Sequence, residues 1–162
     1  DLPPADTKRQ AQLKDCWTWP ESQETECMSP KMYAEIFLPY IAEIANMFGM
    51  SYYGCCERMD DRFPYVKAAI KNLRIVSVSH WNDFKKAGEL LGKEYVYSRK
   101  PTPAYVSTET PNWDLVEKEA KETVEATKNG CLEIICRDVY SSLCTPARAK
   151  EWVKRWKRAA GI

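Results

Sequence analysis

The chain has 162 residues, of which 44% are hydrophobic and 29% charged, and its 24 Lys and Arg residues nearly balance its 23 Asp and Glu residues. This length is enough for one domain with a sizeable core, and the composition is too apolar and aromatic for a disordered chain. The small net charge argues against a basic nucleic-acid-binding protein and against a protein held on a membrane surface by basic residues. The sequence has no run of about 18 apolar residues, so no transmembrane helix is expected.

The amino-terminal segment begins Asp1-Leu2-Pro3-Pro4, without an initiator Met and without the basic and apolar regions of a signal peptide. We expect residues 1–12 to form a linker or a frayed segment, and the chain to be a processed piece of a longer protein. The cysteines number seven and include no CxxC pair. An odd number without a targeting signal predicts reduced thiols and a cytoplasmic location.

Five short segments have the β-branched and aromatic composition of strands. They are residues 17–19, 51–53, 73–78, 94–98 and 132–135. Helical patterns follow each of them, some with good start signals. The expected helices cover residues 30–48 with a kink at Pro39, residues 63–70, a helix capped by Asn82 that runs to Leu91, residues 113–128 capped by Asn112, and a last helix opened by Thr145-Pro146 with Trp152, Val153 and Trp156 on its apolar face.

Strands that alternate with helices predict parallel strands and an α/β fold, here with five strand-then-helix units. No GxGxxG follows the first strand and no GxxxxGK[ST] occurs, which disfavours a dinucleotide or P-loop nucleotide site. In parallel α/β folds the functional groups gather where the strands end. The candidate residues expected at that edge are Glu21, Glu24, Tyr53, Cys55, Cys56, Glu57, His80, Trp81, Arg99, Lys100, Cys136, Arg137 and Asp138.

The cysteines at this edge suggest a metal site. Cys55, Cys56, Glu57 and Cys136 offer sulfur and carboxylate ligands to an ion such as zinc. The alternative is that these cysteines serve as small buried hydrophobic residues. A Gly-Cys-Cys-Glu turn directly after a strand is unusual for a core, so both interpretations stay open for Cys55 and Cys56.

The remaining polar residues suggest proton transfer and anion binding. His80 is the single histidine and the natural proton shuttle near neutral pH, or else it covers a loop. Glu21 and Glu24 form either an acid and base pair or a solvated loop.

The basic residues of the same edge, Arg99, Lys100 and Arg137, suit substrate carboxylates or neighbouring acidic side chains. We also expect Tyr53, Trp81 and Asp138 to bind substrate.

Several motifs, taken in order, resemble the carboxyl-terminal half of the uroporphyrinogen decarboxylase superfamily, which includes porphyrinogen decarboxylases and corrinoid-linked methyltransferases. The resemblance runs from about Cys16 to the carboxyl terminus, so residues 13–162 would form one barrel domain. It is closest to methyltransferase-like members. The motifs that carry it are Glu21-Ser22-Gln23-Glu24, Ser29-Pro30, Leu38-Pro39-Tyr40, Tyr53-Gly54-Cys55-Cys56-Glu57, Ser77-Val78-Ser79-His80-Trp81, Tyr95-Val96-Tyr97-Ser98-Arg99-Lys100-Pro101 and Thr145-Pro146.

The resemblance implies a (β/α)8 (TIM) barrel with its site at the carboxyl-terminal rim. In the methyltransferase branch a His-x-Cys turn and a later Cys hold a zinc ion that activates a thiol acceptor. Tyr53-Gly54-Cys55 takes the place of His-x-Cys, Cys136 lies near the later Cys, and Cys56 or Glu57 would replace the missing His. The implied activity is methyl transfer with a corrinoid-bound or small methylated substrate.

Two alternatives remain. One is decarboxylation of a tetrapyrrole, with Arg99 and Arg137 holding its carboxylate side chains. The other is a non-catalytic interaction or assembly half-barrel. Five units are too few for an eight-unit barrel of about 250 residues, and an open barrel exposes sheet edges and core. We therefore expect an open half-barrel, inactive when isolated, that pairs with another copy or with a missing amino-terminal half.

Overall fold

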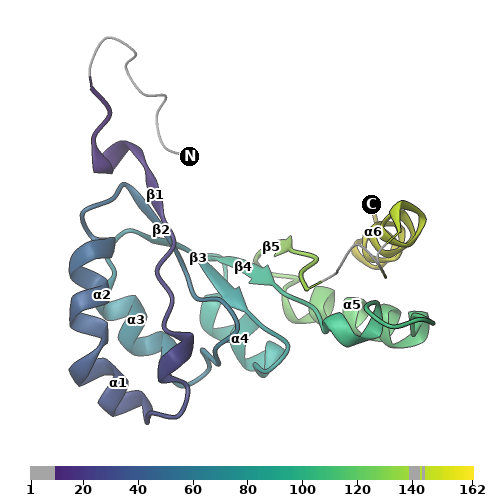
Figure 1. Ribbon diagram of the computed structural model, residues 1–162, viewed down its shortest axis with the longest axis horizontal. Helices are drawn as coiled ribbons and strands as arrows, with labels where there is room; N and C mark the ends of the chain where they lie inside the picture. Colours follow the sequence, from purple (N-terminus) through teal and green to yellow (C-terminus); the bar gives the residue numbers. More distant parts are fainter. Residues whose placement is uncertain (1–9, 139–142, 144) are drawn as a thin grey trace.

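The computed structural model describes residues 10–138, 143 and 145–162. Its centre is a parallel sheet of five strands that lie side by side in the order in which they occur in the chain (Figure 1). The strands are β1 (Trp17–Thr18), β2 (Met50–Tyr53), β3 (Leu73–Val78), β4 (Val96–Arg99) and β5 (Cys131–Ile134). The predicted α/β fold with five strand-then-helix units is confirmed.

Helices connect all of these strands, and one more follows the last strand. They are α1 (Pro30–Ile36), α2 (Leu38–Ala45), α3 (Phe63–Ala69), α4 (Phe84–Leu91), α5 (Trp113–Ala126) and α6 (Pro146–Ala160). Single turns of 3-10 helix form η1 (Leu13–Asp15), η2 (Gln23–Thr25) and η3 (Pro103–Tyr105). Most of the predicted 1–12 linker lies outside the described residues.

Several helices begin at the residue that the sequence predicts. Ser29, Asn112 and Thr145 each accept a hydrogen bond from the backbone N–H three residues ahead, at 3.2, 3.1 and 3.2 Å. These side chains satisfy donors that a helix start leaves unpaired. The Pro39 kink is a full break, because α1 ends at Ile36 and α2 begins at Leu38.

Two local predictions are wrong. The cap of α4 is Asp83 and not Asn82: Asp83 Oδ1 accepts from the N–H groups of Lys85 and Lys86 at 3.1 Å. Asn82 is buried and bonds the preceding loop instead. Val153 is 43% exposed, so it does not share the buried face of the last helix.

The main hydrophobic cluster lies between the sheet and the helices α1 to α4. It contains alternate residues of the strands, including Tyr53, Val76, Val78 and Tyr97, packed against helical residues such as Tyr33. Because side chains alternate across a strand, the residues between them point to the opposite face of the sheet. That opposite face is where the polar groups described below meet.

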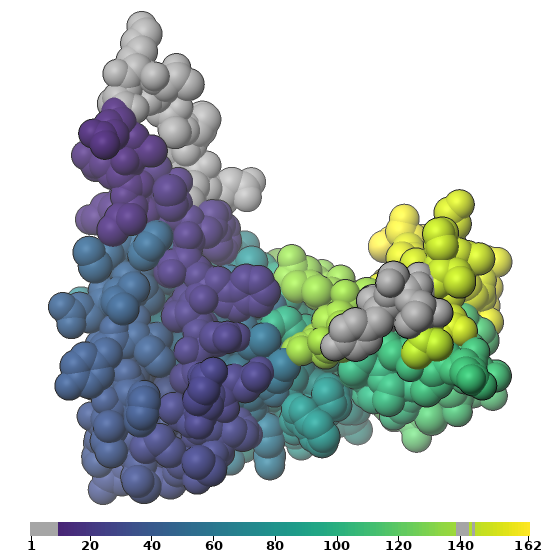
Figure 2. All heavy atoms as spheres, in the orientation of Figure 1, coloured from purple at the N-terminus to yellow at the C-terminus, as the bar shows by residue number. Residues whose placement is uncertain are grey.

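A second hydrophobic cluster joins α5 and α6. It contains Val116, Ala120, Trp152 and Trp156, and the two tryptophan rings lie 5.6 Å apart. Figure 2 shows α5 and α6, in green and yellow, as an arm beside the body formed by the earlier elements. In the described part of the chain, no helix combines the length and the apolar character that crossing a membrane requires.

Candidate functional site

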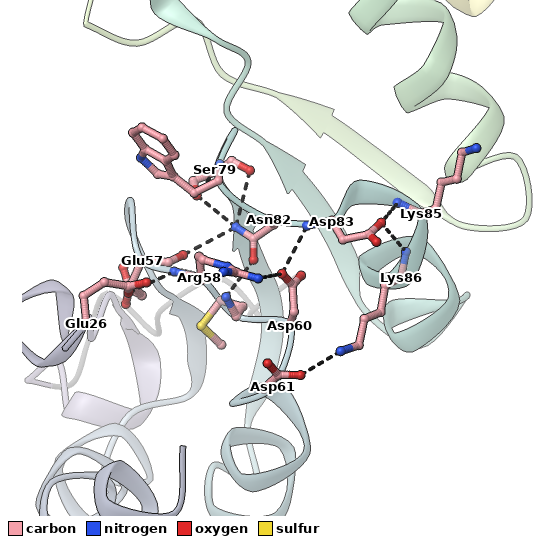
Figure 3. Close-up of polar contacts among 12 residues, drawn as sticks. Glu26, Glu57, Arg58, Asp60, Asp61, Ser79, Asn82, Asp83, Lys85 and Lys86 are labelled. Atoms are coloured by element: carbon pink, nitrogen blue, oxygen red, sulfur yellow. Dashed lines mark hydrogen bonds and ion pairs between the residues drawn. The ribbon is translucent and has the colours of Figure 1, made fainter. Parts of the chain in front are cut away.

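Hydrogen bonds join the two loops that follow the carboxyl ends of β2 and β3 (Figure 3). Asn82 Oδ1 accepts from the Met59 N–H at 2.6 Å, and Asn82 Nδ2 donates to Ser79 Oγ at 2.9 Å. The Asp83 N–H donates to Asp60 Oδ2 at 3.1 Å. These bonds hold the turn after β2, which carries the two adjacent cysteines, in a fixed position above the sheet.

The cysteine turn begins at Gly54, whose φ of +93° favours glycine. The Gly54 carbonyl accepts from Trp19 Nε1 at 2.8 Å. The Cys55 carbonyl accepts from Ser77 Oγ at 2.7 Å and from Lys100 Nζ at 3.2 Å. With its backbone anchored in this way, the turn brings Cys55 Sγ and Cys56 Sγ to 3.7 Å from each other.

Glu57 supports the turn from within. Its side chain is buried, Oε2 accepts from the Cys55 N–H at 2.7 Å, and Oε1 accepts from the Ser22 N–H at 3.1 Å. Both carboxylate oxygens therefore accept hydrogen bonds from backbone N–H groups. Glu57 positions the turn and is poorly placed to bind a metal ion.

The two thiols differ in their surroundings. Cys56 Sγ accepts a hydrogen bond from Arg137 Nη1, and Arg137 Nε donates to Asp138 Oδ2 at 2.7 Å. Partial burial, followed by a hydrogen bond with Glu21, raises the pKa of the Cys55 thiol to about 12. Cys55 is therefore a protonated thiol at neutral pH, and the Arg137 guanidinium lies closer to Cys56 Sγ than to Cys55 Sγ, which is 4.0 Å from Nη1.

Lys100 is buried beneath this turn. Its Nζ lies 5.0 Å from the ring centre of Trp19 and 5.4 Å from that of Tyr52, within the range of a cation–π contact. Burial lowers the pKa of Lys100. No carboxylate lies within ion-pair distance of Lys100 among the residues that the structure describes.

A cleft of about 450 Å³ opens beside the second thiol. It is lined by Gln23, Glu26, Cys56, Glu57, Arg58 and Trp81. Trp81 is 63% exposed, and its ring lies 4.3 Å from that of His80. Cys56 therefore lies in the wall of the cleft, and Trp81 forms one aromatic side of it.

His80 itself is half-buried, and its Nδ1 has no hydrogen-bond partner within the described ranges. Burial, followed by the charge of Arg99, lowers its pKa. Of the two predicted acidic residues, Glu21 reaches Cys55, whereas Glu24 lies exposed in η2. The two carboxylates are not brought to one reacting point.

Two predicted binding residues lie on the helix side of the sheet. Arg99 is 1% exposed, and its Nη2 donates to Glu119 Oε1 of α5 at 2.6 Å. Tyr53 is fully buried, and its hydroxyl bonds those of Ser22 and Tyr33. Both side chains are used inside the protein and turned away from the cysteines.

Cys136 packs against the second hydrophobic cluster together with Ile134. On the opposite face, the structure brings together Cys55, Cys56, Lys100 and Arg137, with Asp138 and Trp81 beside them. The sequence did not single out two residues: Tyr52, which covers Lys100 together with Trp19, and Glu119, which holds Arg99 on the helix side of the sheet. The signal for Tyr52 is its place next to Tyr53 in β2, on the opposite face.

A zinc ion fits the described residues only in part. In a tetrahedral site with zinc–sulfur bonds of about 2.3 Å, two sulfurs lie roughly 3.8 Å apart, which Cys55 and Cys56 match at 3.7 Å. A zinc site also needs at least one further protein ligand. Within residues 10–138, 143 and 145–162, no group of three His, Cys, Asp or Glu side chains could hold a metal. The guanidinium of Arg137 against Cys56 also opposes a cation.

Neither the protein-family models nor the curated proteins give a match to this chain. The chain has an α/β fold with a parallel five-stranded sheet, and a pair of adjacent thiols, one guanidinium and one buried ammonium lie at the carboxyl ends of the strands.

Proposed function

We propose that this protein carries out thiol-dependent methyl transfer, with the sulfur of Cys56 as the group that accepts the methyl carbon. The observation that carries this proposal is the contact of Arg137 with Cys56 Sγ at the wall of an open cleft. A sulfur nucleophile needs a neighbouring positive charge and access to its substrate, and in this proposal Arg137 and the cleft provide them to Cys56.

The reaction is a substitution at carbon. The Cys56 proton passes to water in the cleft, the sulfur attacks the methyl carbon, and a sulfur–carbon bond forms. The bond between methyl and donor atom breaks, and its electron pair stays with the donor. Arg137, held in place by Asp138, stabilises the sulfur charge before attack. A small thiol acceptor then loses its proton to water, and its sulfur attacks the same methyl carbon. The bond between the methyl carbon and Cys56 breaks, and its electron pair returns to the Cys56 sulfur.

The methyl donor in this proposal is a corrinoid-bound methyl group or a small methylated molecule. A corrinoid supplies a methyl carbon that a thiolate can attack. The aromatic face of Trp81 offers a flat wall to such a donor. The described residues hold only two sulfur ligands for zinc, so no step of the reaction depends on it.

For the fold, we propose the carboxyl-terminal part of a (β/α)8 barrel of the uroporphyrinogen decarboxylase superfamily. Five parallel strands in chain order support this, because barrel strands follow one another in that way. Among the described residues β5 pairs with β4 alone, which leaves an edge. A second copy of the chain or further strand-then-helix units would cover that edge and complete the site.

Tetrapyrrole decarboxylation has less support. It would use Arg99 and Arg137 to hold carboxylate side chains, but Arg99 is buried and bonded to Glu119. That leaves Arg137 and the buried Lys100 for a substrate with several carboxylates. We therefore favour methyl transfer over tetrapyrrole decarboxylation as the proposed activity.

The test measures methylation of the protein itself, so that it does not require a complete barrel. The full chain is incubated with methylcobalamin or an S-methylated sulfonium donor, and peptide mass spectrometry locates any added methyl group. We expect methyl on Cys56 and its loss in Cys56→Ser. Cys131→Ser, at an exposed cysteine of β5, is the matched control and should leave the reaction unchanged. No methyl on Cys56, or equal methylation of Cys16 and Cys131, would overturn the proposal.

A further inference from the structure

The sulfurs of Cys55 and Cys56 lie close enough to each other to form a disulfide after a small movement. Their separation of 3.7 Å is the contact distance of two thiols, and a disulfide requires about 2.05 Å. Closing the pair therefore needs a shift of less than 2 Å, which rotation of two side chains and one peptide can supply. None of the cysteines in the described part of the chain forms a disulfide.

We propose that Cys56 and Cys55 form a peroxide-responsive thiol switch, in which Cys56 is oxidised first and Cys55 then closes a disulfide between adjacent residues. The switch uses the same two thiols as the proposed methyl transfer, but it requires neither a methyl donor nor a metal. It is a regulatory modification of that site.

The first step takes place at Cys56 because its surroundings favour it. Cys56 lines the open cleft, and Arg137 donates to its sulfur. The sulfur attacks one oxygen of hydrogen peroxide, a sulfur–oxygen bond forms, and the oxygen–oxygen bond breaks. Hydroxide leaves and takes up the thiol proton as water, so that Cys56 becomes a sulfenic acid.

The second step uses the neighbouring thiol. Cys55 attacks the sulfur of the sulfenic acid, a sulfur–sulfur bond forms, and the sulfur–oxygen bond breaks. The oxygen leaves as water with the proton of Cys55. Over both steps the two thiols lose two electrons and two protons, and one peroxide is reduced to two waters. Cys55 is suited to this role because its sulfur already lies 3.7 Å from that of Cys56.

The resulting disulfide is strained, which makes it reversible. Cα atoms of adjacent residues are about 3.8 Å apart, whereas disulfides usually join Cα atoms about 4.4 to 6.8 Å apart. Strained disulfides are reduced more readily than structural ones. Small thiols should therefore restore the pair, as a regulatory site requires.

Ring closure also changes the neighbouring residues. The peptide between Cys55 and Cys56 becomes part of the closed ring, and its carbonyl is the oxygen that accepts from Ser77 Oγ and Lys100 Nζ. Rotation of this peptide removes these two acceptor contacts. Oxidation therefore consumes both thiols and also frees the buried ammonium, so that the oxidised site cannot accept a methyl group.

The test treats the full chain with hydrogen peroxide in the absence of any methyl donor. Peptide mass spectrometry should find a Cys55–Cys56 peptide that has lost two hydrogens, and dithiothreitol should restore it. In Cys55→Ser, a cyclic diketone probe should trap sulfenic acid on Cys56. In Cys56→Ser, oxidation at Cys55 should be slower by roughly tenfold or more. Cys131→Ser is again the matched control and should behave like the wild type.

Two results would overturn the switch. One is a disulfide that joins two chains, or a different pair of cysteines, in place of the adjacent pair. The other is oxidation of Cys16, Cys27 or Cys131 as fast as that of Cys56. The methylation experiment separates the two proposals, because methyl transfer can fail while the disulfide forms, and the disulfide can fail while methyl transfer occurs.

Discussion

The guanidinium of Arg99, at the end of β4, forms a buried ion pair with Glu119 of α5, with Nη2 and Oε1 2.6 Å apart. Glu119 also accepts hydrogen bonds from the backbone N–H and the hydroxyl of Thr102. A buried charge that loses its partner destabilises a protein strongly. This pair therefore joins α5 to the sheet, and removing one member isolates a charge.

We expect Glu119→Ala to lower the free energy of unfolding by about 3 kcal/mol, because Arg99 would stay buried without its partner. Urea unfolding followed by circular dichroism measures the change. Glu94→Ala removes the exposed pair between Glu94 and Lys67 and should lower the free energy of unfolding far less than Glu119→Ala, because solvent screens exposed pairs. The double variant Arg99→Met, Glu119→Leu should be more stable than Glu119→Ala; equal or lower stability would contradict the buried-charge explanation.

Gly88 provides a second test, at the contact between α4 and α5. A Cβ at this position would lie 2.2 Å from the Ala126 carbonyl oxygen, so Gly88→Ala forces the two helices apart. We expect a loss of about 2 kcal/mol, although Ala is favoured over Gly in a helix by about 1 kcal/mol. Glu89→Ala, at the exposed neighbouring position, should be neutral or slightly stabilising. A more stable Gly88→Ala would show that the helices are not in contact there.

A third stability prediction concerns the hydroxyl of Tyr53. It is bonded to the hydroxyls of Ser22 and Tyr33 in the core. Tyr53→Phe leaves these two hydroxyls without that partner, and we expect a loss of about 1 to 2 kcal/mol in unfolding free energy. Tyr40→Phe, at a side chain that is 71% exposed, is the matched control and should change nothing. Equal stability of the two variants would argue against this core network.

The lowered pKa of His80 predicts that the stability of the protein depends on pH. Burial lowers its pKa in the folded protein, so the unfolded chain binds this proton more readily. Its neutral form favours folding fully above the ordinary pKa of about 6.5, and this contribution is lost as the pH falls through that value toward the lower folded pKa. His80 is the single histidine. His80→Gln should therefore show a smaller fall in Tm between pH 7 and pH 5 than the wild type, and an identical fall would contradict the lowered pKa.

Local sequence signals predicted the elements well and the direction of individual side chains poorly. The strand over residues 73–78 and the caps at Ser29, Asn112 and Thr145 follow from propensity and capping alone. Strand alternation places Tyr52 and Tyr53 on opposite faces but leaves open which face the helices cover. The helices cover the face of Tyr53, which therefore belongs to the core and not to the site.

Arg99 and Lys100 also point to opposite faces of the sheet. Sequence position places both at the edge of the sheet, but Arg99 turns toward α5 and Lys100 toward the cysteine turn. Cys136 likewise shares its face with Ile134 and joins the second cluster. Asn82 failed as a cap because a tertiary bond to the Met59 N–H uses its side chain. In each case long-range packing, which no local window contains, decided the outcome.

The division of the apolar core into two clusters has a consequence for unfolding. The α6 helix buries Trp152 and Trp156 in the second cluster, packed with α5 residues such as Val116, while β3 lies in the first. Segments with separate cores open with separate free energies. Amide hydrogen exchange in α6 should therefore report a lower opening free energy than in β3, so that the carboxyl-terminal helix detaches as a unit while the sheet and the thiol pair stay folded.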